Sequence, residues 1–425
     1  MLIIPFTFSI DASTYAFAYA KNRIVGDSRN ECSYLFVLDD RAWIFGSKKF
    51  RADLNRGIPK ISVVIPAYNE EDSIESTVRS LYDQTLRPKN VIVVDDCSTD
   101  GTPEICQRLK KELGDTFIYI RRERNSGKAS NISFVTKEFV EQLGEITLIN
   151  DSDTTPYRTC IERLVKNFAP DDVAAATPYG YTTAPRNWIA RTLHYGNAWN
   201  NRIFKFRKKA QYFRGGISVV CGACTAYRTK VLLQLPIPQR TKTEDTDYTW
   251  ILQENGYKVV YDETAQAYSR DLAKPTALLR QWFRWYSGTY QSIFIHGRQL
   301  LRAKSLFWAT VLPAIVESVP YSLGVFTLPI IIVINLAMPA AHIPYFGMAY
   351  VKGFLLADFL FTAIPTAIIS PGYLLRLPHI YFYKYAASSL TLLALLKTIY
   401  EGVTGQKHKW GSTWSRRYGL NAQQN

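Results

Sequence analysis

Short runs of β-branched and apolar residues alternate with helical stretches, and this alternation constrains the fold more than any other feature of the chain. The runs span residues 61–66, 91–94, 117–120 and 146–149. Continuous apolar runs of this length are typical of parallel strands that are buried on both faces. Residues 74–82 have apolar side chains at helical spacing after an acidic start. The alternation predicts a doubly wound α/β sheet, whose ligands bind at the carboxyl ends of the strands.

Paired carboxylates directly follow two of the predicted strands. Asp95 and Asp96 end the second run, and Asp151 and Asp153 follow the fourth. A carboxylate is costly to bury unless it is paired or bound to a cation. Two of them at one strand end can hold a divalent metal and the diphosphate that the metal bridges. A single D-x-D step also occurs in many solvated turns, but acidic pairs at two strand ends predict a shared nucleotide site.

A glycine and a lysine lie between these two strand ends, in the segment 125–131. Gly127 allows the backbone to approach a ligand closely, and Lys128 supplies a point charge for phosphate. The spacing is not that of a Walker A loop. The segment therefore predicts either a phosphate contact or a surface turn with a solvated lysine.

Two later segments also carry candidate chemistry. Glu244 and Asp245 precede an amphipathic stretch, either as an acidic helix N-terminus or with one carboxylate as a general base. Gln281, Arg284 and Trp285 fall at helical positions i, i+3 and i+4, so they share one face. Tryptophan can stack on a sugar and arginine can pair with phosphate. The alternative for this helix is a place at a membrane surface with aromatic and basic anchors.

The net charge of +15 fits nucleic acid, an anionic membrane or an anionic substrate as partner. The basic residues are dispersed and no zinc-finger spacing is present, so we expect no nucleic-acid partner. The six cysteines are scattered, which is typical of reduced, intracellular thiols. Cys221 and Cys224 have C-x-x-C spacing, but without a second pair or a nearby histidine they predict neither a zinc nor a redox site.

Taken together, these motifs resemble the family-2 inverting glycosyltransferases of the GT-A fold. The match is best with the membrane-integrated branch that contains hyaluronan, chitin, cellulose and poly-N-acetylglucosamine synthases. It covers about residues 58–290 by ordered motifs and extends less firmly to about 415. The resemblance implies a Rossmann-like GT-A domain, a nucleotide-sugar donor and Mg²⁺ or Mn²⁺ as cofactor.

The resemblance also implies a role for each motif on the donor side. Asp96 or its neighbour Asp95 would contact uracil, Lys128 would lie near the diphosphate, and Asp153 would be a better metal ligand than Asp151. Tyr68 belongs to the opening nucleotide loop. The residues that would bind the donor are Tyr68, Glu70, Asp95, Asp96, Lys128, Asp151, Asp153, Gln281, Arg284 and Trp285.

On the acceptor side, the resemblance implies that Cys221 and Gly222 lie beside the acceptor sugar together with Trp285. Asp245, next to Glu244, would be the catalytic base. The segment 410–413 resembles a gating segment that follows the membrane helices in the family.

The C-terminal part predicts membrane helices. Residues 306–338 contain no basic residue and only one acid, which fits an interfacial lead-in followed by a span. Residues 345–370 form a second candidate span, in which Lys352 and Asp358 suggest a face turned to protein or to a polar pore. Residues 381–400, with Lys384, suit an interfacial or re-entrant helix. A basic tail predicts an even number of crossings and a cytosolic catalytic domain, with four crossings as the alternative.

We therefore expect an N-terminal segment 1–57 of unassigned role, a GT-A domain at 58–290, membrane helices at 291–400 and a cytosolic tail at 401–425. The expected reaction is inverting transfer from UDP-N-acetylglucosamine or UDP-glucose to a growing polysaccharide. A non-processive enzyme that makes a glycolipid, as ceramide glucosyltransferases do, is the alternative, and a catalytically inactive scaffold is a third. Two or three spans are few for a channel, so a processive enzyme would need partners or a second copy.

Overall fold

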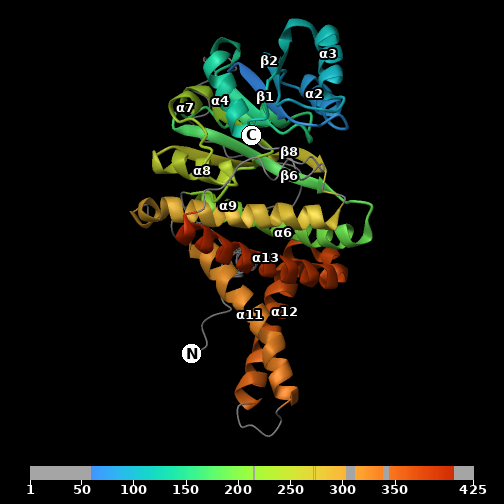
Figure 1. The fold of residues 1–425 in the computed structure, drawn as a ribbon, viewed down its shortest axis with the longest axis vertical. Helices are drawn as coiled ribbons and strands as arrows, with labels where there is room; N and C mark the ends of the chain where they lie inside the picture. The colour runs from blue at the N-terminus through green and yellow to red at the C-terminus, as the bar shows by residue number, and fades with distance from the viewer. Residues whose placement is uncertain are drawn as a thin grey trace, which may run out of the picture.

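The computed structural model describes residues 59–213, 216–270, 272, 274–302, 312–337 and 344–405. The predictions made for the segments 1–57 and 410–413 lie outside the described residues. Figure 1 shows an α/β layer at one end and a group of long helices at the other.

A mixed sheet of eight strands forms the centre of the α/β layer, in the order β3-β2-β1-β4-β7-β6-β8-β5. Its four parallel strands are β1 (Ile61–Ala67), β2 (Asn90–Asp95), β3 (Phe117–Arg121) and β4 (Ile146–Asn150). These confirm the strands predicted from the apolar runs. The remaining strands are β5 (Thr154–Pro156), β6 (Val173–Thr183), β7 (Cys224–Arg228) and β8 (Lys258–Arg270). The sheet is therefore mixed, since β7 runs antiparallel to both of its neighbours.

Helices cover both faces of the parallel half because side chains alternate along each strand. Ile61, Val63 and Ile65 of β1 are buried in one apolar cluster, whereas Val64 is buried in another on the opposite face. The helices of this layer are α2 (Ile74–Tyr82), α3 (Thr102–Leu113), α4 (Lys128–Glu138), α5 (Cys160–Lys166), α7 (Thr229–Gln234) and α8 (Glu244–Glu254). Short 3₁₀ turns are η1 (Gly114–Thr116), η2 (Val140–Gln142) and η4 (Pro371–Arg376).

Among the described residues, five long helices make up the other end of the molecule. They are α6 (Trp188–Phe213), α9 (Pro275–Arg302), α11 (Leu312–Ala337), α12 (Pro344–Ile369) and α13 (Leu377–Thr404). In Figure 1, α6 and α9 lie across the edge of the α/β layer, α13 lies beneath them, and α11 and α12 project away from it. Helix α13 packs on α9, α6 and α11, so it joins the projecting helices to the α/β layer.

Of the described helices, α12 contains a segment long and apolar enough to cross a bilayer, Gly347–Ile369. This segment coincides with the second predicted span. In α11 the apolar segment Tyr321–Ile334 is shorter, so a multi-pass topology stays a prediction. Asp358 of α12 faces protein, as expected, because it pairs with Lys384 of α13 and accepts a hydrogen bond from Tyr321 (3.1 Å). Lys384 is therefore buried against a carboxylate, although the sequence suggested an interfacial anchor.

Candidate active site

The loops after β1 and β2 lie side by side at the carboxyl edge of the sheet. The backbone N–H of Asn69 donates to Ser98 Oγ (3.0 Å), and that of Glu70 donates to Thr102 Oγ1 (2.8 Å). Burial and the nearby Asp96 raise the pKa of Tyr68, which keeps its hydroxyl protonated. The opening loop predicted from the sequence therefore contacts the loop that follows the first acidic strand end.

The two carboxylates at the end of β2 have different partners. Asp95 is fully buried and accepts hydrogen bonds from Tyr119 Oη (2.8 Å) and the backbone N–H of Ser98 (2.8 Å). Asp96 accepts the backbone N–H groups of Ser126 (2.9 Å) and Gly127 (2.7 Å). Asp95 thus stabilises its own loop, whereas Asp96 connects β2 to the segment that precedes Lys128.

Lys128 is at the centre of a charge cluster that unites three distant parts of the sequence. Its Nζ donates to Asp151 Oδ1 (2.5 Å) and to the carbonyl oxygen of Gly222 (2.7 Å), and it lies 3.6 Å from Glu244 Oε1. Burial lowers the pKa of Lys128, but the surrounding carboxylates raise it overall, so the ammonium stays charged. The lysine is therefore not a solvated surface residue.

Strand β7 brings the C-x-x-C segment to this cluster. It pairs with β4 so that Cys224 lies opposite Asn150, and the backbone N–H of Asp151 donates to the carbonyl of Ala223 (2.8 Å). The N–H of Cys221 donates to Thr177 Oγ1 (2.7 Å). The five cysteines in the described part of the chain are all free thiols. The segment thus forms one wall of the site.

Asp245 lies against Gly222 at the beginning of α8. A Cβ atom on Gly222 would lie 2.6 Å from Asp245 Oδ2, so glycine is needed for this close approach. Burial, reinforced by the charge of Glu244, raises the pKa of Asp245 to about 6. A carboxylate with a pKa near the working pH is well suited to accept a proton from a substrate hydroxyl.

Helix α9 packs against the loop that leads into α8. Arg284 Nη1 donates to the carbonyl of Lys242 (3.0 Å), and the positive charge of Arg284 also acts on Asp245. Trp285 is 39% exposed and Gln281 is partly buried. The predicted shared face of α9 therefore borders the site through Arg284 and Trp285. Among the described residues, no hydrogen bond or ion pair joins Gln281 to the charge cluster around Lys128.

Gly288 of α9 sets the distance to this loop, and we expect Gly288→Ala to impair catalysis. The added Cβ would lie 2.2 Å from Thr243 Oγ1 and 2.7 Å from the Thr243 backbone nitrogen. The loop before Asp245 must then move, and a displacement near 1 Å can cost about 10²-fold in rate. Steady-state kinetics would measure the loss. Gly297→Ala, on the same helix with nothing within 4 Å, is the control and should retain activity.

A second ionic cluster, which the sequence did not reveal, joins α8 to α9. His296 contacts Asp247 Oδ1 through Nε2 (2.7 Å) and Glu254 Oε1 through Nδ1 (2.8 Å). Arg240 donates to both oxygens of Asp247 (2.9 Å each). His296 is 49 residues from Asp247 and 42 residues from Glu254, and helical periodicity gives no sign of the pairing. The cluster fixes the helix with the candidate base against the helix with Arg284.

This cluster predicts a loss of stability at alkaline pH. Burial lowers the pKa of His296, but its two carboxylate partners raise it to about 9 from 6.5 in the unfolded chain. The raised pKa stabilises the fold fully below pH 6.5, by about 3 kcal/mol, and this contribution is lost as pH rises through 9. His296→Gln should therefore lower Tm at pH 7 and flatten its decrease between pH 8 and 10. Lys166→Ala, which removes only an exposed pair with Glu162, should change Tm little.

The D-x-D carboxylates have the chemistry of a divalent-metal site that the substrate completes. Asp153 is partly buried beside Thr154, and Asp151 is held by Lys128. No group of three or more histidine, cysteine, aspartate or glutamate side chains gathers around a metal position in the described ranges. Mg²⁺ commonly binds through one or two carboxylates plus substrate phosphates and water, and this donor set fits that pattern.

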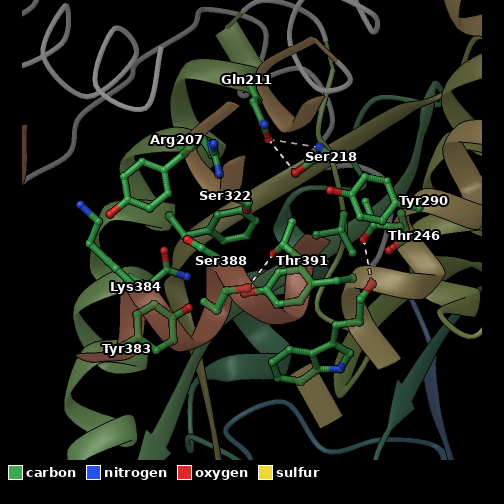
Figure 2. Close-up of a pocket in the computed structure, with 18 of the residues that line it drawn as sticks. Arg207, Gln211, Ser218, Thr246, Tyr290, Ser322, Tyr383, Lys384, Ser388 and Thr391 are labelled. Atoms are coloured by element: carbon green, nitrogen blue, oxygen red, sulfur yellow. Dashed lines mark hydrogen bonds between the residues drawn. The ribbon is translucent and has the colours of Figure 1, made fainter. Parts of the chain in front are cut away.

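A cavity of about 290 Å³ lies between α6, α8, α9, α11 and α13. Figure 2 shows Thr246 and Tyr290 on one side of it and Lys384, Ser388 and Ser322 on another. Trp285 also lines it, and none of the described residues that line it is an aspartate or a glutamate. Of these residues, the sequence assigned only Trp285 to the site, because the wall is assembled from helices that are far apart in the sequence. Its aromatic residues are Trp199, Phe204, Trp250, Trp285, Tyr286 and Tyr290 together with Tyr321 and Tyr383.

Comparisons with known proteins agree with this fold. Residues 62–235 match the sequence model of the family described as Glycosyl transferase family 2. Over 290 residues the chain is 26% identical to the uncharacterized glycosyltransferase YaiP of Escherichia coli. This match covers 67% of this chain and 69% of YaiP. It is 22% identical over 266 residues to poly-beta-1,6-N-acetyl-D-glucosamine synthase of Staphylococcus aureus, covering 59% of this chain. That match spans 62% of the synthase, less than two thirds of its length.

A solved structure shares the fold along most of the chain. The mannosyltransferase PcManGT from Pyrobaculum calidifontis, in complex with GDP-Man and Mn²⁺, is similar over 93% of this chain and 96% of its own, with a TM-score of 0.57 and 16% identity. The fold is that of a GT-A domain, and residues 62–235 within it match the glycosyltransferase family 2 model. The protein is a glycosyltransferase.

Proposed function

We propose that the enzyme transfers a sugar, with inversion, from UDP-N-acetylglucosamine or UDP-glucose to a growing polysaccharide at a membrane. One observation carries the proposal: Lys128, Asp151 and Asp245 meet around Gly222, directly beside a cavity rich in aromatic residues. The similarity to a poly-N-acetylglucosamine synthase supports the type of donor. PcManGT, which has the same fold, was solved with a nucleotide sugar and Mn²⁺, which supports a divalent metal here.

In the proposed reaction, Asp245 takes the proton from an acceptor hydroxyl. The acceptor oxygen then attacks the anomeric carbon from the face opposite the diphosphate, the bond between that carbon and the phosphate oxygen breaks, and UDP leaves. Lys128 and Arg284 stabilise the negative charge that develops on the leaving group. Asp153 and Asp151 would hold Mg²⁺ or Mn²⁺, whose chemistry when bound is to neutralise the diphosphate.

The cavity is our proposed acceptor site. Thr246, the neighbour of Asp245, and Trp285 line it, so an acceptor bound there would approach the base. Aromatic faces next to hydroxyl and amide side chains are a common lining for sugar rings. Cys221 and Gly222 would complete the acceptor site on the side of the sheet.

We further propose that the hairpin of α11 and α12 inserts into the membrane and leaves the catalytic domain in the cytosol. Apolar side chains on both helices are exposed, which is expected where lipid replaces water. They include Leu323, Phe326, Ile330, Val333, Leu356, Phe359 and Ile364. We propose, as the sequence predicts, that the chain crosses the membrane an even number of times and that its domains meet near residues 57, 290 and 400. We also propose that a processive enzyme would work as a homo-oligomer or with partners.

The second candidate is a non-processive enzyme that makes a glycolipid. The cavity reaches Tyr321 and Ser322 of α11, so a lipid acceptor on the projecting helices would have direct access to it. Size-exclusion chromatography of the product separates the two candidates. A polymer supports the polysaccharide synthase, and a single glycolipid supports the alternative.

The pH dependence of activity follows from Asp245. Because its pKa is raised to about 6, the base is deprotonated above that value and protonated below it. We expect kcat/KM to increase with pH through an apparent pKa near 6 and then to level off. Initial rates between pH 4.5 and 8.5 would measure this profile, and a flat profile across pH 6 would contradict the role of Asp245.

A further inference from the structure

Two arginines from distant parts of the chain converge on one tyrosine just after the end of α12. The Cζ atom of Arg202, on α6, lies 4.9 Å from the ring centre of Tyr373, and that of Arg376, in η4, lies 5.3 Å from the same centre. Arg376 also stacks on Tyr195 of α6 (4.1 Å). Arg202 Nη1 donates to Ser370 Oγ (2.9 Å). Two positive charges are therefore held over a single aromatic ring.

No carboxylate neutralises these two arginines among the residues that the structure describes. The neighbouring elements α6, η4 and β6 contain no aspartate or glutamate. Helices α12 and α13 contain one acid each. Asp358 of α12 is paired with Lys384, and Glu401 lies near the far end of α13, about 37 Å from Arg376 along the helix.

The acids of β8, which packs on α6, are also engaged elsewhere. Glu263 pairs with two lysines of α6, and Asp262 accepts a hydrogen bond from Asn167 (2.8 Å). Like charges repel when no counter-ion lies between them, and an aromatic ring compensates only in part. Arg202 is exposed and Arg376 is partly exposed, so an anion from outside can reach both.

The position of the two arginines relative to the candidate span indicates where this anion comes from. The span Gly347–Ile369 has 23 residues and extends about 34 Å as a helix, slightly more than a hydrocarbon core of about 30 Å. Ser370 follows directly and leads into η4, where Leu375 is 92% exposed and Leu374 is also exposed. Apolar side chains at this depth enter the acyl region, while arginines stay among the headgroups.

We propose that Arg202 and Arg376 bind the phosphate of an anionic membrane lipid, whose acyl chains lie beside Leu374 and Leu375. The proposal rests on the proposed function, because it requires the hairpin of α11 and α12 to be inserted in the membrane. Guanidinium groups bind phosphate oxygens through paired, charge-assisted hydrogen bonds. A headgroup with a net negative charge neutralises two arginines, whereas a zwitterionic headgroup brings its own cation.

The lipid site is connected to the cavity through α6. Trp199, one helical turn before Arg202, lines the cavity, and its Nε1 donates to Thr366 Oγ1 of α12 (2.8 Å). A lipid that bridges Arg202 of α6 and Arg376 of η4 also holds α6 against the end of α12. The bound lipid therefore stabilises one wall of the proposed acceptor site.

Thermal unfolding of the purified full-length enzyme in detergent micelles tests the proposal with three probes. Dioctanoyl-phosphatidylglycerol is anionic, dioctanoyl-phosphatidylcholine has the same chains without net charge, and inorganic phosphate has no chains. We expect phosphatidylglycerol to raise Tm at a concentration about tenfold lower than either of the other two. An equal response to the two lipids would overturn the proposal. An equal response to phosphatidylglycerol and phosphate would replace the lipid by a free anion and overturn it as well.

Variants of the two arginines separate lipid binding from a purely structural role. Arg202→Gln combined with Arg376→Gln should abolish the preference for phosphatidylglycerol, and the corresponding double lysine variant, which keeps both charges, should retain part of it. The matched control, Arg87→Gln with Arg158→Gln, removes two exposed arginines of the α/β layer and should respond as wild type. A double glutamine variant that still prefers phosphatidylglycerol would contradict the proposal, whatever its Tm without lipid.

Extraction of membranes with alkaline carbonate tests the insertion of the hairpin separately. Wild-type enzyme that stays in the membrane but responds equally to both lipids would contradict the lipid site alone. Release of the wild-type enzyme by carbonate would contradict the proposed insertion, and with it the reason to assign the site to a lipid.

Discussion

Replacing Asp245 with asparagine is expected to lower kcat by about 10²–10⁴-fold, the range that a positioned general base contributes. Asparagine has nearly the same shape and keeps the contact with Gly222, but it cannot accept the proton of the acceptor hydroxyl. Donor affinity should change little, because Lys128, Asp151 and Asp153 remain in place. Initial rates measure kcat, and calorimetric titration with UDP measures nucleotide binding.

The control for this variant is Asp115→Asn, which alters an exposed carboxylate just before β3. It should retain the activity of the wild type. Turnover close to wild type in Asp245→Asn would exclude Asp245 as the base and direct attention to Glu244, which also lies beside Lys128.

Lys128→Met should produce the second large effect, a decrease in kcat of about 10²–10³-fold, as expected when one preorganised electrostatic contact is removed. The ammonium touches Asp151 and Gly222 and lies near Glu244, so its loss leaves several carboxylates facing one another. Their repulsion should also raise the pKa of Asp245 above about 6. The pH profile should therefore shift to higher pH together with the decrease in rate.

Two further variants distinguish this electrostatic effect from a general loss of folding. Lys128→Arg keeps the charge and should recover part of the activity, although its planar group does not fit the same contacts. Lys89→Met, at an exposed lysine that donates to the carbonyl of Glu141, should behave as wild type. An unchanged pH profile in Lys128→Met would contradict the proposed coupling to Asp245.

The parallel half of the fold could be predicted from sequence because it is locally encoded. Strands β1, β2 and β4 are continuous apolar runs, and their burial on both faces is visible in the composition of each run. Strand β3, at the edge of the sheet, is also an apolar run but is only partly buried. Strands β6 and β8 are longer and more polar at their ends, and β8 contains Asp262 and Glu263. Their pairing joins residues 84 to 87 positions apart, which periodicity does not reveal.

The sequence indicated most residues of the candidate site, but it did not indicate which of them contact one another. The sequence indicated Asp96, with its neighbour Asp95 as the alternative. The structure buries Asp95 behind Tyr119 and directs Asp96 to the backbone before Lys128. The contact between Lys128 and Glu244 joins residues that are over 100 positions apart.

The central claim is inverting transfer from a UDP-sugar, and proton NMR of the reaction tests it most directly. The purified full-length enzyme is incubated with UDP-N-acetylglucosamine or UDP-glucose, an acceptor and Mg²⁺ or Mn²⁺, and the anomeric signals are followed over time. We expect UDP to appear as the α-anomeric donor signal is replaced by a β-linked product. An α-linked product, or no consumption of either donor, would contradict the account.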